Sequence, residues 1–495
     1  MGPAALALAL ALGGTPASAA PPPNVVVVMV DDLGWLDHGL DLSGAPPASE
    51  RHFRTPNLRR LAEHGVVFSQ AYAAAPVCTP TRVSLMTGRS PGATHVTYWT
   101  LHAGRDNSAK FEGLRPPAWQ VDGLQPGAPT LPSLLAGAGY RTIHVGKAHW
   151  GARGTAGADP RALGYDVNVA GHAAGAPGSY RSRERFSGGD PVWDVPGLEA
   201  WYERDVFLTE ALAAEAVAAL EDAVGDGKRF FLHFAPYAVH VPIQANERLL
   251  GHYEGLDPRE AAYATMVESV DEALGAILDT LERLGVADET AVVFTSDNGG
   301  LAAHGRGGEP HTQNAPLRSG KGSYYEGGVR VPLVVRLPGA TGARRDVDAP
   351  VVTWDLTPTL LALAGVQAPA DTAAGFEGLD LGPLLRGEGA LAERALCWNQ
   401  PHYWGIRGPG VEPFSSVRRG DWKLVWRHRD RGFELYDLAH DVGEEHDLSA
   451  AEPERVRALA GDLDTWIERV GAQLSLDAST GSEIEPPLAA LPRER

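Results

Sequence analysis

Two pairs of oxygen-bearing side chains follow apolar segments of the sequence. Asp31 and Asp32 come directly after the β-branched run at 25–30, and a second such run ends at Asp297 and Asn298. Open α/β sheets bind ligands beyond the carboxyl ends of their strands, where both pairs would lie. Three carboxylates and one amide oxygen form an all-oxygen set that suits Ca²⁺ or Mg²⁺ better than zinc. Either pair alone would equally suit a turn or a helix cap, so the predicted metal site depends on their occurring together.

A second candidate site begins at Cys78, in the segment CTPTR. Pro80 lies in the first turn of a helix that we expect to continue over residues 83–88. A side chain at such a helix start faces unpaired backbone N–H groups and the positive end of the helix dipole. Together with the fixed charge of Arg82, this favours an anion such as sulfate or phosphate. For an isolated cysteine, a small buried apolar side chain is the simpler interpretation.

The elements that would position these residues alternate between strands and helices along the chain. Short apolar runs indicate strands, and apolar residues at steps of three and four between capping residues indicate helices. The predicted strands are 25–30, 141–145, 230–235 and 291–296, and the predicted helices are 55–65, 131–138, 206–224 and 263–284. Such repeated units predict an α/β fold with a large, mostly parallel sheet and helices on both faces.

The pattern changes after about residue 369. Residues 422–426 and 432–438 are typical of two paired strands, and residues 453–470 of a closing helix. We therefore expect a smaller C-terminal α+β subdomain. The predicted division is a large domain at 20–370, which would carry both candidate sites, and the subdomain at 371–495.

Composition and the N-terminus exclude several classes of protein. The 495 residues include 43 basic and 62 acidic ones, a formal net charge of −19, which excludes nucleic acid as a partner. Two cysteines cannot form a disulfide framework, and no apolar stretch of the mature chain is long enough to span a membrane. Residues 1–19 combine an apolar run with the sequence Ala17-Ser18-Ala19, which predicts a signal peptide and a periplasmic or secreted protein. A disordered Ala-rich tail is the alternative.

The CTPTR segment, continued by Leu85-Met86-Thr87-Gly88, resembles the signature of the type I, formylglycine-dependent sulfatases of the alkaline phosphatase superfamily. Further segments resemble this family in the same order: Val30-Asp31-Asp32-Leu33-Gly34-Trp35, Val145-Gly146-Lys147 with His149, Ala238-Val239-His240-Val241-Pro242, Ser296-Asp297-Asn298-Gly299-Gly300, Gly320-Lys321-Gly322 with Glu326-Gly327-Gly328, Asp355 with Thr357-Pro358-Thr359-Leu360-Leu361, and Glu434-Leu435-Tyr436-Asp437-Leu438. The resemblance extends from about residue 24 to 450. It implies an alkaline phosphatase-like fold and a sulfuric ester hydrolase, with the large domain as the catalytic one.

The resemblance implies two cofactors. A formylglycine-generating enzyme would oxidise Cys78 to Cα-formylglycine, whose hydrate offers two hydroxyl groups. One hydroxyl would attack sulfur, and the second would let the adduct collapse by elimination, so that no water has to attack a stable ester. The metal ion, Ca²⁺ or alternatively Mg²⁺, would be bound by Asp31, Asp32, the converted Cys78, Asp297 and Asn298.

The resemblance also assigns catalytic roles to five further side chains. Arg82 and Lys147 would hold the hydrated aldehyde and the sulfate oxygens. Lys321 and His240 would protonate the departing alcohol. His149 would remove a proton from the second hydroxyl, which expels sulfate. With Cys78, these residues form the predicted catalytic set.

The substrate implied by the resemblance is a sulfated galactose or N-acetylhexosamine, with aryl sulfates as simpler substrates. The likeness is closest to bacterial carbohydrate sulfatases of the arylsulfatase A and N-acetylgalactosamine sulfatase kind. Side chains in the irregular segments at 104–127 and 151–194 and in nearby loops are candidates for contacting a sugar, although each alone is typical of loop packing. They are His95, Trp99, His102, His172, Trp193, His304 and His311.

Two alternative functions stay open: a phosphodiester or phosphonate monoester hydrolase on the same fold, and a non-catalytic binder of sulfated glycans.

Overall fold

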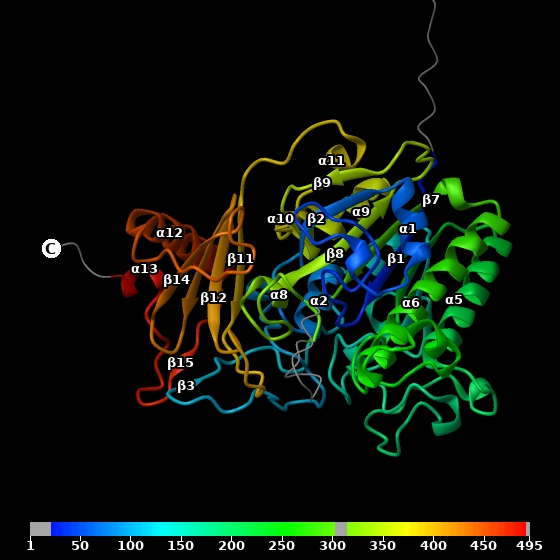
Figure 1. The fold of residues 1–495 in the computed structure, drawn as a ribbon, viewed down its shortest axis with the longest axis horizontal. Coiled ribbons are helices and arrows are strands. Elements are labelled where there is room, and N and C mark those ends of the chain that lie inside the picture. The colour runs from blue at the N-terminus through cyan, green and yellow to red at the C-terminus, as the bar shows by residue number, and fades with distance from the viewer. Residues whose placement is uncertain (1–20, 302–313, 492–495) are drawn as a thin grey trace, which may run out of the picture.

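The structure, a computed structural model, describes residues 21–301 and 314–491, and a nine-stranded sheet forms its centre (Figure 1). The strand order is β10-β2-β8-β7-β1-β6-β4-β5, and β9 also pairs with β2. These strands are β1 (Asn24–Val30), β2 (Val66–Tyr72), β4 (Arg141–Gly146), β5 (Val167–Val169), β6 (Phe230–Ala235), β7 (Thr290–Ser296), β8 (Arg330–Arg336), β9 (Arg345–Val347) and β10 (Val351–Val352). The four predicted strands are confirmed as β1, β4, β6 and β7.

Helices cover both faces of this sheet, as predicted. Side chains alternate between the faces along a strand, so Val26 and Val28 of β1 pack against one helical layer and Val25 and Val27 against the other. The first layer contains α1 (Pro56–Glu63), α5 (Leu208–Gly225) and α6 (Pro258–Arg283), and the second contains α2 (Cys78–Thr87), α4 (Leu131–Gly137) and α9 (Leu356–Leu363). Every residue of β1 is buried, which explains why its sequence is continuously apolar.

One long strand departs from the parallel pattern. The strands from β7 through β1, β6 and β4 to β5 are parallel to their neighbours, whereas β8 is antiparallel to both β7 and β2. An antiparallel strand begins at the sheet edge where its neighbour ends. The backbone just before β8 therefore returns to the end of β7, where the Lys321 N–H donates to the Gly300 carbonyl at 3.0 Å.

A second, antiparallel sheet forms the C-terminal subdomain. It contains β11 (Ala395–Gln400), β12 (Phe414–Arg419), β13 (Trp422–Arg427) and β14 (Phe433–Asp437), in that order. Helix α12 (Pro453–Val470) packs on one face, and the other face contacts the large domain through aromatic residues such as Tyr72, Trp354 and Trp398. The predicted strand pair and closing helix are confirmed as β13, β14 and α12, while β11 and β12 were not predicted.

Further short helices and strands, besides several 3-10 turns, occur in the part of the chain that the structure describes. They are α3 (Pro91–Thr94), α8 (Glu326–Val329), α10 (Ala370–Ala374), α11 (Gly382–Arg386), α13 (Pro487–Ala490), β3 (Leu114–Arg115) and β15 (Leu476–Asp477). The predicted domain boundary at residue 370 stays a prediction. Helix α11 follows this residue but packs with the large sheet, and the second sheet begins only at β11. The predicted signal peptide lies outside the described residues. Among the helices of the described ranges, none combines the length and the hydropathy needed to cross a bilayer.

Candidate active site

The four oxygen-bearing side chains singled out in the sequence lie together at the carboxyl ends of β1 and β7. These strands are adjacent and parallel, with Val30 opposite Ser296, so the residues that follow them lie side by side. The backbone N–H of Asp32 donates to Asp297 Oδ1 at 3.1 Å, and Asn298 Nδ2 donates to Asp32 Oδ1 at 2.7 Å. The parallel pairing of two strands thus brings together residues that are far apart in the sequence.

Two lysines neutralise the first carboxylate pair. Lys147 follows β4, and its Nζ lies 2.7 Å from Asp31 Oδ2. Lys321 Nζ lies 2.6 Å from Asp32 Oδ1. Both lysine side chains are at most 3% exposed, and a buried ammonium is costly unless it has an anionic partner. The carboxylates therefore hold two ammonium groups in a dry site where an anionic ligand can also bind them.

Arg82, from α2, is fully buried and binds the third carboxylate. Its Nε donates to Asp297 Oδ2 at 2.8 Å, and its Nη1 donates to the backbone carbonyl of Lys147 at 2.8 Å. Its Nη2 has no hydrogen-bond acceptor among the described residues and lies 3.9 Å from Asp31 Oδ1. The guanidinium thus keeps one amino group for a further acceptor, such as an oxygen of sulfate.

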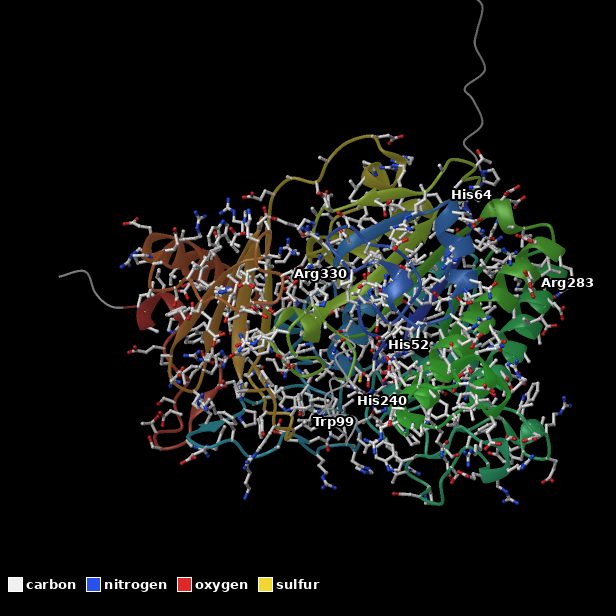
Figure 2. The ribbon with its side chains drawn as sticks, in the orientation of Figure 1. His52, His64, Trp99, His240, Arg283 and Arg330 are labelled. Carbon is white, nitrogen blue, oxygen red and sulfur yellow. The ribbon has the colours of Figure 1, made fainter. Side chains whose placement is uncertain are left out.

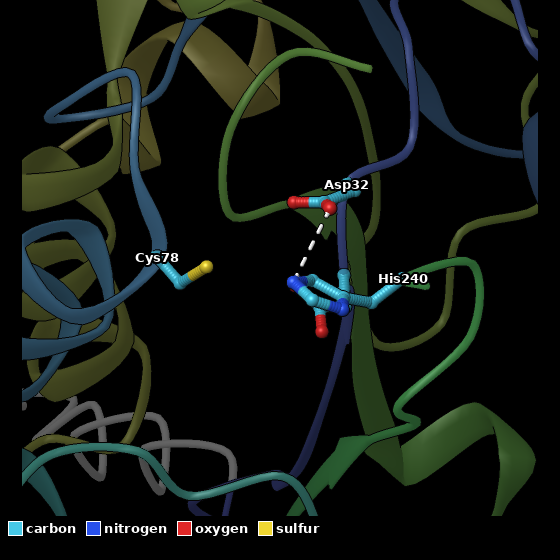
Figure 3. A group of neighbouring side chains, drawn as sticks. Asp32, Cys78 and His240 are labelled. Carbon is cyan, nitrogen blue, oxygen red and sulfur yellow. Dashed lines mark ion pairs between the residues drawn. The ribbon is translucent and has the colours of Figure 1, made fainter. Parts of the chain in front are cut away.

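Cys78 is the first residue of α2 and is 4% exposed. Its Sγ lies 3.2 Å from Lys321 Nζ, and Figure 3 shows the sulfur pointing toward Asp32 and His240. Burial raises the pKa of the thiol to about 11, although Lys147 and Lys321 oppose the shift. A protonated thiol is a poor nucleophile. The position therefore suits attack on an anion, but the unmodified thiol does not supply the nucleophile.

Two histidines complete the predicted catalytic set. His149 Nε2 lies 2.8 Å from the Thr100 carbonyl, and because a carbonyl only accepts, Nε2 carries the hydrogen. Its Nδ1 is buried without a hydrogen-bond partner among the described residues and is free to accept a proton. His240 Nε2 lies 3.7 Å from Asp32 Oδ2 (Figure 3). Burial lowers the pKa of His149 well below its ordinary value, and burial with Lys321 lowers that of His240 to about 3, so both rings are neutral here.

Three buried oxygens at the centre of the site fit a hard divalent cation. Within the described residues, Asp31 Oδ1, Asp32 Oδ2 and Asn298 Oδ1 have no hydrogen-bond donor, which is costly unless a cation binds them. Burial raises the pKa of Asp31 well above its ordinary value although Lys147 lies beside it, and a bound divalent cation would favour the ionised carboxylate. Carboxylate and amide oxygens are the donors that Ca²⁺ and Mg²⁺ prefer.

The group of side chains that could ligate this cation differs in part from the predicted one. Single ligand atoms of Asp31, Asp32, Cys78 and His240 lie within 4.8 Å of one another. Asp297 is not in that group, and its two oxygens accept hydrogen bonds from Arg82 Nε and the Asp32 backbone N–H. The role of Asp297 as a metal ligand stays a prediction.

A cavity of about 200 Å³ adjoins this cluster. Four residues of the predicted catalytic set line it: Cys78, His149, His240 and Lys321. The other described residues of its wall are Val77, Trp99, Gly175, Ala176, Trp193, Val241, Leu301, Trp404 and Ile406. Figure 2 shows His240 and Trp99 close together on the lower side of the molecule. A group attached to an anion held by the three cations would lie in this apolar cavity.

Comparison with known proteins places the chain in a family. Residues 23–366 match the family described as Sulfatase. The chain belongs to the sulfatase family. Residues 320–471 also match the domain described as N-sulphoglucosamine sulphohydrolase, C-terminal. The predicted enzyme class, a sulfuric ester hydrolase, is thereby confirmed, and the two alternatives are not favoured.

The relatives of this sulfatase match it over most of its length. It is 34% identical to N-acetylgalactosamine-6-sulfatase of Homo sapiens over 484 residues, which cover 90% of this chain and 85% of the relative. It is 31% identical to a sulfatase of Formosa agariphila over 521 residues, which cover 94% of this chain and 92% of the relative. The solved structure of Ps i-CgsB in complex with k-i-k-neocarrahexaose matches with a TM-score of 0.70 at 25% identity. The match covers 90% of this chain and 92% of that structure's chain. The predicted sulfatase fold with its C-terminal subdomain is confirmed.

The loop residues considered as sugar contacts are only partly brought to the cavity of this sulfatase. Trp99 and Trp193 line it, whereas His95 binds the Gly471 carbonyl through Nε2 instead. His102 and His172 are not among its described lining residues, and His304 and His311 lie outside the described residues. Trp404, in the connection between β11 and β12, was missed because no motif surrounds it.

Proposed function

We propose that this sulfatase removes sulfate from a sugar ring, a sulfated galactose or N-acetylhexosamine, using a Cα-formylglycine formed from Cys78 and a bound Ca²⁺ or Mg²⁺. The observation that carries the proposal is the position of Cys78, 3.2 Å from Lys321 Nζ at the edge of the buried cation cluster. An anion held there would lie next to the side chain of residue 78. The similarity to an N-acetylgalactosamine-6-sulfatase and to a sulfatase-fold structure in complex with k-i-k-neocarrahexaose supports a carbohydrate substrate.

The geometry supports a role for each basic side chain. Formylglycine supplies the hydroxyl nucleophile that the protonated thiol lacks, and the divalent cation supplies positive charge for an anionic substrate. Arg82, through its free Nη2, and Lys147 bind the sulfate oxygens. Lys321, which lines the cavity, faces the oxygen of the departing alcohol and gives it a proton. His240 lines the cavity beside it, and its ring is neutral here, so it shares this role only where a bound anion raises its pKa. His149 accepts a proton from residue 78 through Nδ1.

Charge balance explains why a cation belongs in this proposal. The basic groups Arg82, Lys147 and Lys321 are matched by the carboxylates of Asp31, Asp32 and Asp297. A divalent cation would give this balanced cluster a net positive charge. The whole chain carries −19, which would weakly repel an anion, but salt screens such repulsion over about 8 to 10 Å. Local positive charge is then sufficient to bind a sulfate ester.

We expect Asp32→Asn to weaken Ca²⁺ binding at least about tenfold. The substitution keeps the shape of the side chain but removes a negative charge from the metal site. Calorimetric titration of EDTA-treated protein with Ca²⁺, and the rise of the thermal midpoint with Ca²⁺, measure this without turnover. The control is Asp279→Asn, on the exposed face of α6, which should leave the affinity unchanged. Stripped wild-type protein that binds neither Ca²⁺ nor Mg²⁺ and keeps full activity would contradict the metal site.

Mass spectrometry of the peptide containing residue 78, combined with a substrate panel, tests the proposed function. In protein from its native host we expect an aldehyde at residue 78 and hydrolysis of at least one position-defined sulfated galactose or N-acetylgalactosamine. An unmodified thiol would instead indicate a non-catalytic glycan binder. Much faster hydrolysis of aryl phosphonates than of any sulfate ester would indicate a phosphonate monoester hydrolase.

The proposal extends to the maturation of the protein. The formylglycine-generating enzyme has to reach Cys78 before folding is complete, because the folded chain leaves that side chain only 4% exposed. Residues 1–19 would direct export, and the mature enzyme would act in the periplasm or outside the cell. The apolar run and the small-x-small sequence Ala17-Ser18-Ala19 support this part of the proposal.

A further inference from the structure

Three tryptophans from separate parts of the chain line the cavity next to the cation cluster. Trp99 lies in the segment after α3, Trp193 precedes α5, and Trp404 comes from the β11–β12 connection of the C-terminal subdomain. All three are half-buried. Among the described lining residues, the only Lys, Arg, Asp or Glu is Lys321, so the wall beyond the cluster is apolar and aromatic. Such a wall suits a flat, neutral group.

Trp404 packs beside Lys321. The neighbouring residue is Gly322, with φ +84°, and a Cβ added to it would lie 2.3 Å from Trp404 Cε3. The indole ring therefore packs directly on the backbone of residue 322. Lys321 Nζ lies 5.5 Å from the centroid of the ring, within the range of a cation–π contact. The C-terminal subdomain thus brings an aromatic face next to the proposed proton donor.

The size of the cavity limits what can occupy it. Sites for drug-sized ligands usually measure roughly 300–1,000 Å³, whereas the described residues enclose about 200 Å³. This space holds one ring, and any further sugars of a longer substrate would lie outside it. A ring attached to a sulfate in the cation cluster would project past Lys321 toward Trp404.

We propose that Trp404 is a specificity-determining residue that stacks on the ring of the leaving alcohol. This inference rests on the proposed function, since it names the contact of the same substrate. The C–H face of a pyranose, or an aromatic ring, packs against indole and loses contact with water. The sulfate itself is bound by the cations and does not touch Trp404. Removal of the indole should therefore weaken binding of the ring and leave binding of the anion unchanged.

The test compares a ligand with a ring and a ligand without one. For Trp404→Ala, we expect KM for the best sulfated monosaccharide to rise about 10- to 100-fold. The inhibition constant of inorganic sulfate, which has no ring, should change less than twofold. Trp404→Phe should keep KM close to the wild-type value, because phenylalanine keeps an aromatic face. The control is Trp422→Leu, at a half-buried tryptophan of β13 stacked on Arg455, which should change neither constant.

Several results would overturn the inference. An unchanged KM in Trp404→Ala, or equal increases of KM and of the sulfate inhibition constant, would mean that Trp404 does not bind the ring. If the alanine variant does not fold, Trp404→Leu carries the test, since it keeps apolar volume without a ring. Formylglycine-containing wild-type enzyme that hydrolyses no sulfate ester would overturn the proposed function and this inference together. A wild-type enzyme that is active, with unchanged selectivity in the variants, would overturn this inference alone.

Discussion

Replacing Cys78 with alanine is expected to lower kcat by at least about 10⁴-fold, whatever the sulfate ester. The variant lacks the atom from which the nucleophile is made, and no other described side chain of the cavity is placed to replace it. The loss of one buried sulfur atom at a helix start should cost only about 1 kcal/mol of unfolding free energy. Steady-state kinetics and urea unfolding measure the two effects separately.

The second cysteine provides the matched control for this experiment. Cys397 is equally buried, in β11 of the C-terminal subdomain, and does not line the cavity. Cys397→Ala should therefore keep its turnover. The Cys78→Ala variant should still bind inorganic sulfate, because Arg82, Lys147 and Lys321 are retained. More than about a tenth of wild-type activity in Cys78→Ala would refute its role as the source of the nucleophile.

Four long strands of the sheet, β1, β4, β6 and β7, could be predicted from the sequence because they are buried on both faces, whereas β2 was missed. A strand such as β1 needs apolar, β-branched residues at every position, and this requirement is visible locally. β8 could not be predicted in the same way, because Pro332 interrupts it and proline is unfavourable inside a sheet. The partner strand accommodates it: the register of β2 against β8 shifts between Phe68 and Ala71, opposite this proline. Only the paired strands show how the missing N–H is tolerated.

The cation cluster could be predicted for a related reason. Its members lie in short contiguous motifs at the ends of strands and at a helix start, so their types and spacing carry the information. The aromatic wall could not, because Trp404 reaches the cavity from a different subdomain. Its contact with Gly322 joins two segments that no motif connects. The residues of the cation cluster were therefore visible in the sequence, while a contact that would select the substrate required the fold.

The second large effect is expected at Lys321. Lys321→Arg should lower kcat for a sulfated sugar by about 10²- to 10⁴-fold, the usual contribution of general acid catalysis. Arginine keeps the positive charge beside Asp32 and so preserves the buried ion pair, but its guanidinium does not release a proton. The variant thus separates proton donation from charge. The thermal midpoint should stay near the wild-type value.

The leaving group decides whether this interpretation is correct. A sugar alcohol leaves poorly without a proton, whereas 4-nitrophenolate leaves readily as an anion, so Lys321→Arg should lose far less activity with 4-nitrophenyl sulfate than with a sulfated sugar. The ratio of the two losses is measured from kcat for both substrates. The control is Lys110→Arg, at an exposed lysine outside the cavity, which should change neither value. Little loss with either substrate would mean that Lys321 acts through its charge alone. Equal losses with both substrates would mean that the shape of the lysine side chain matters rather than its proton. In both cases the proton comes from His240 or another group.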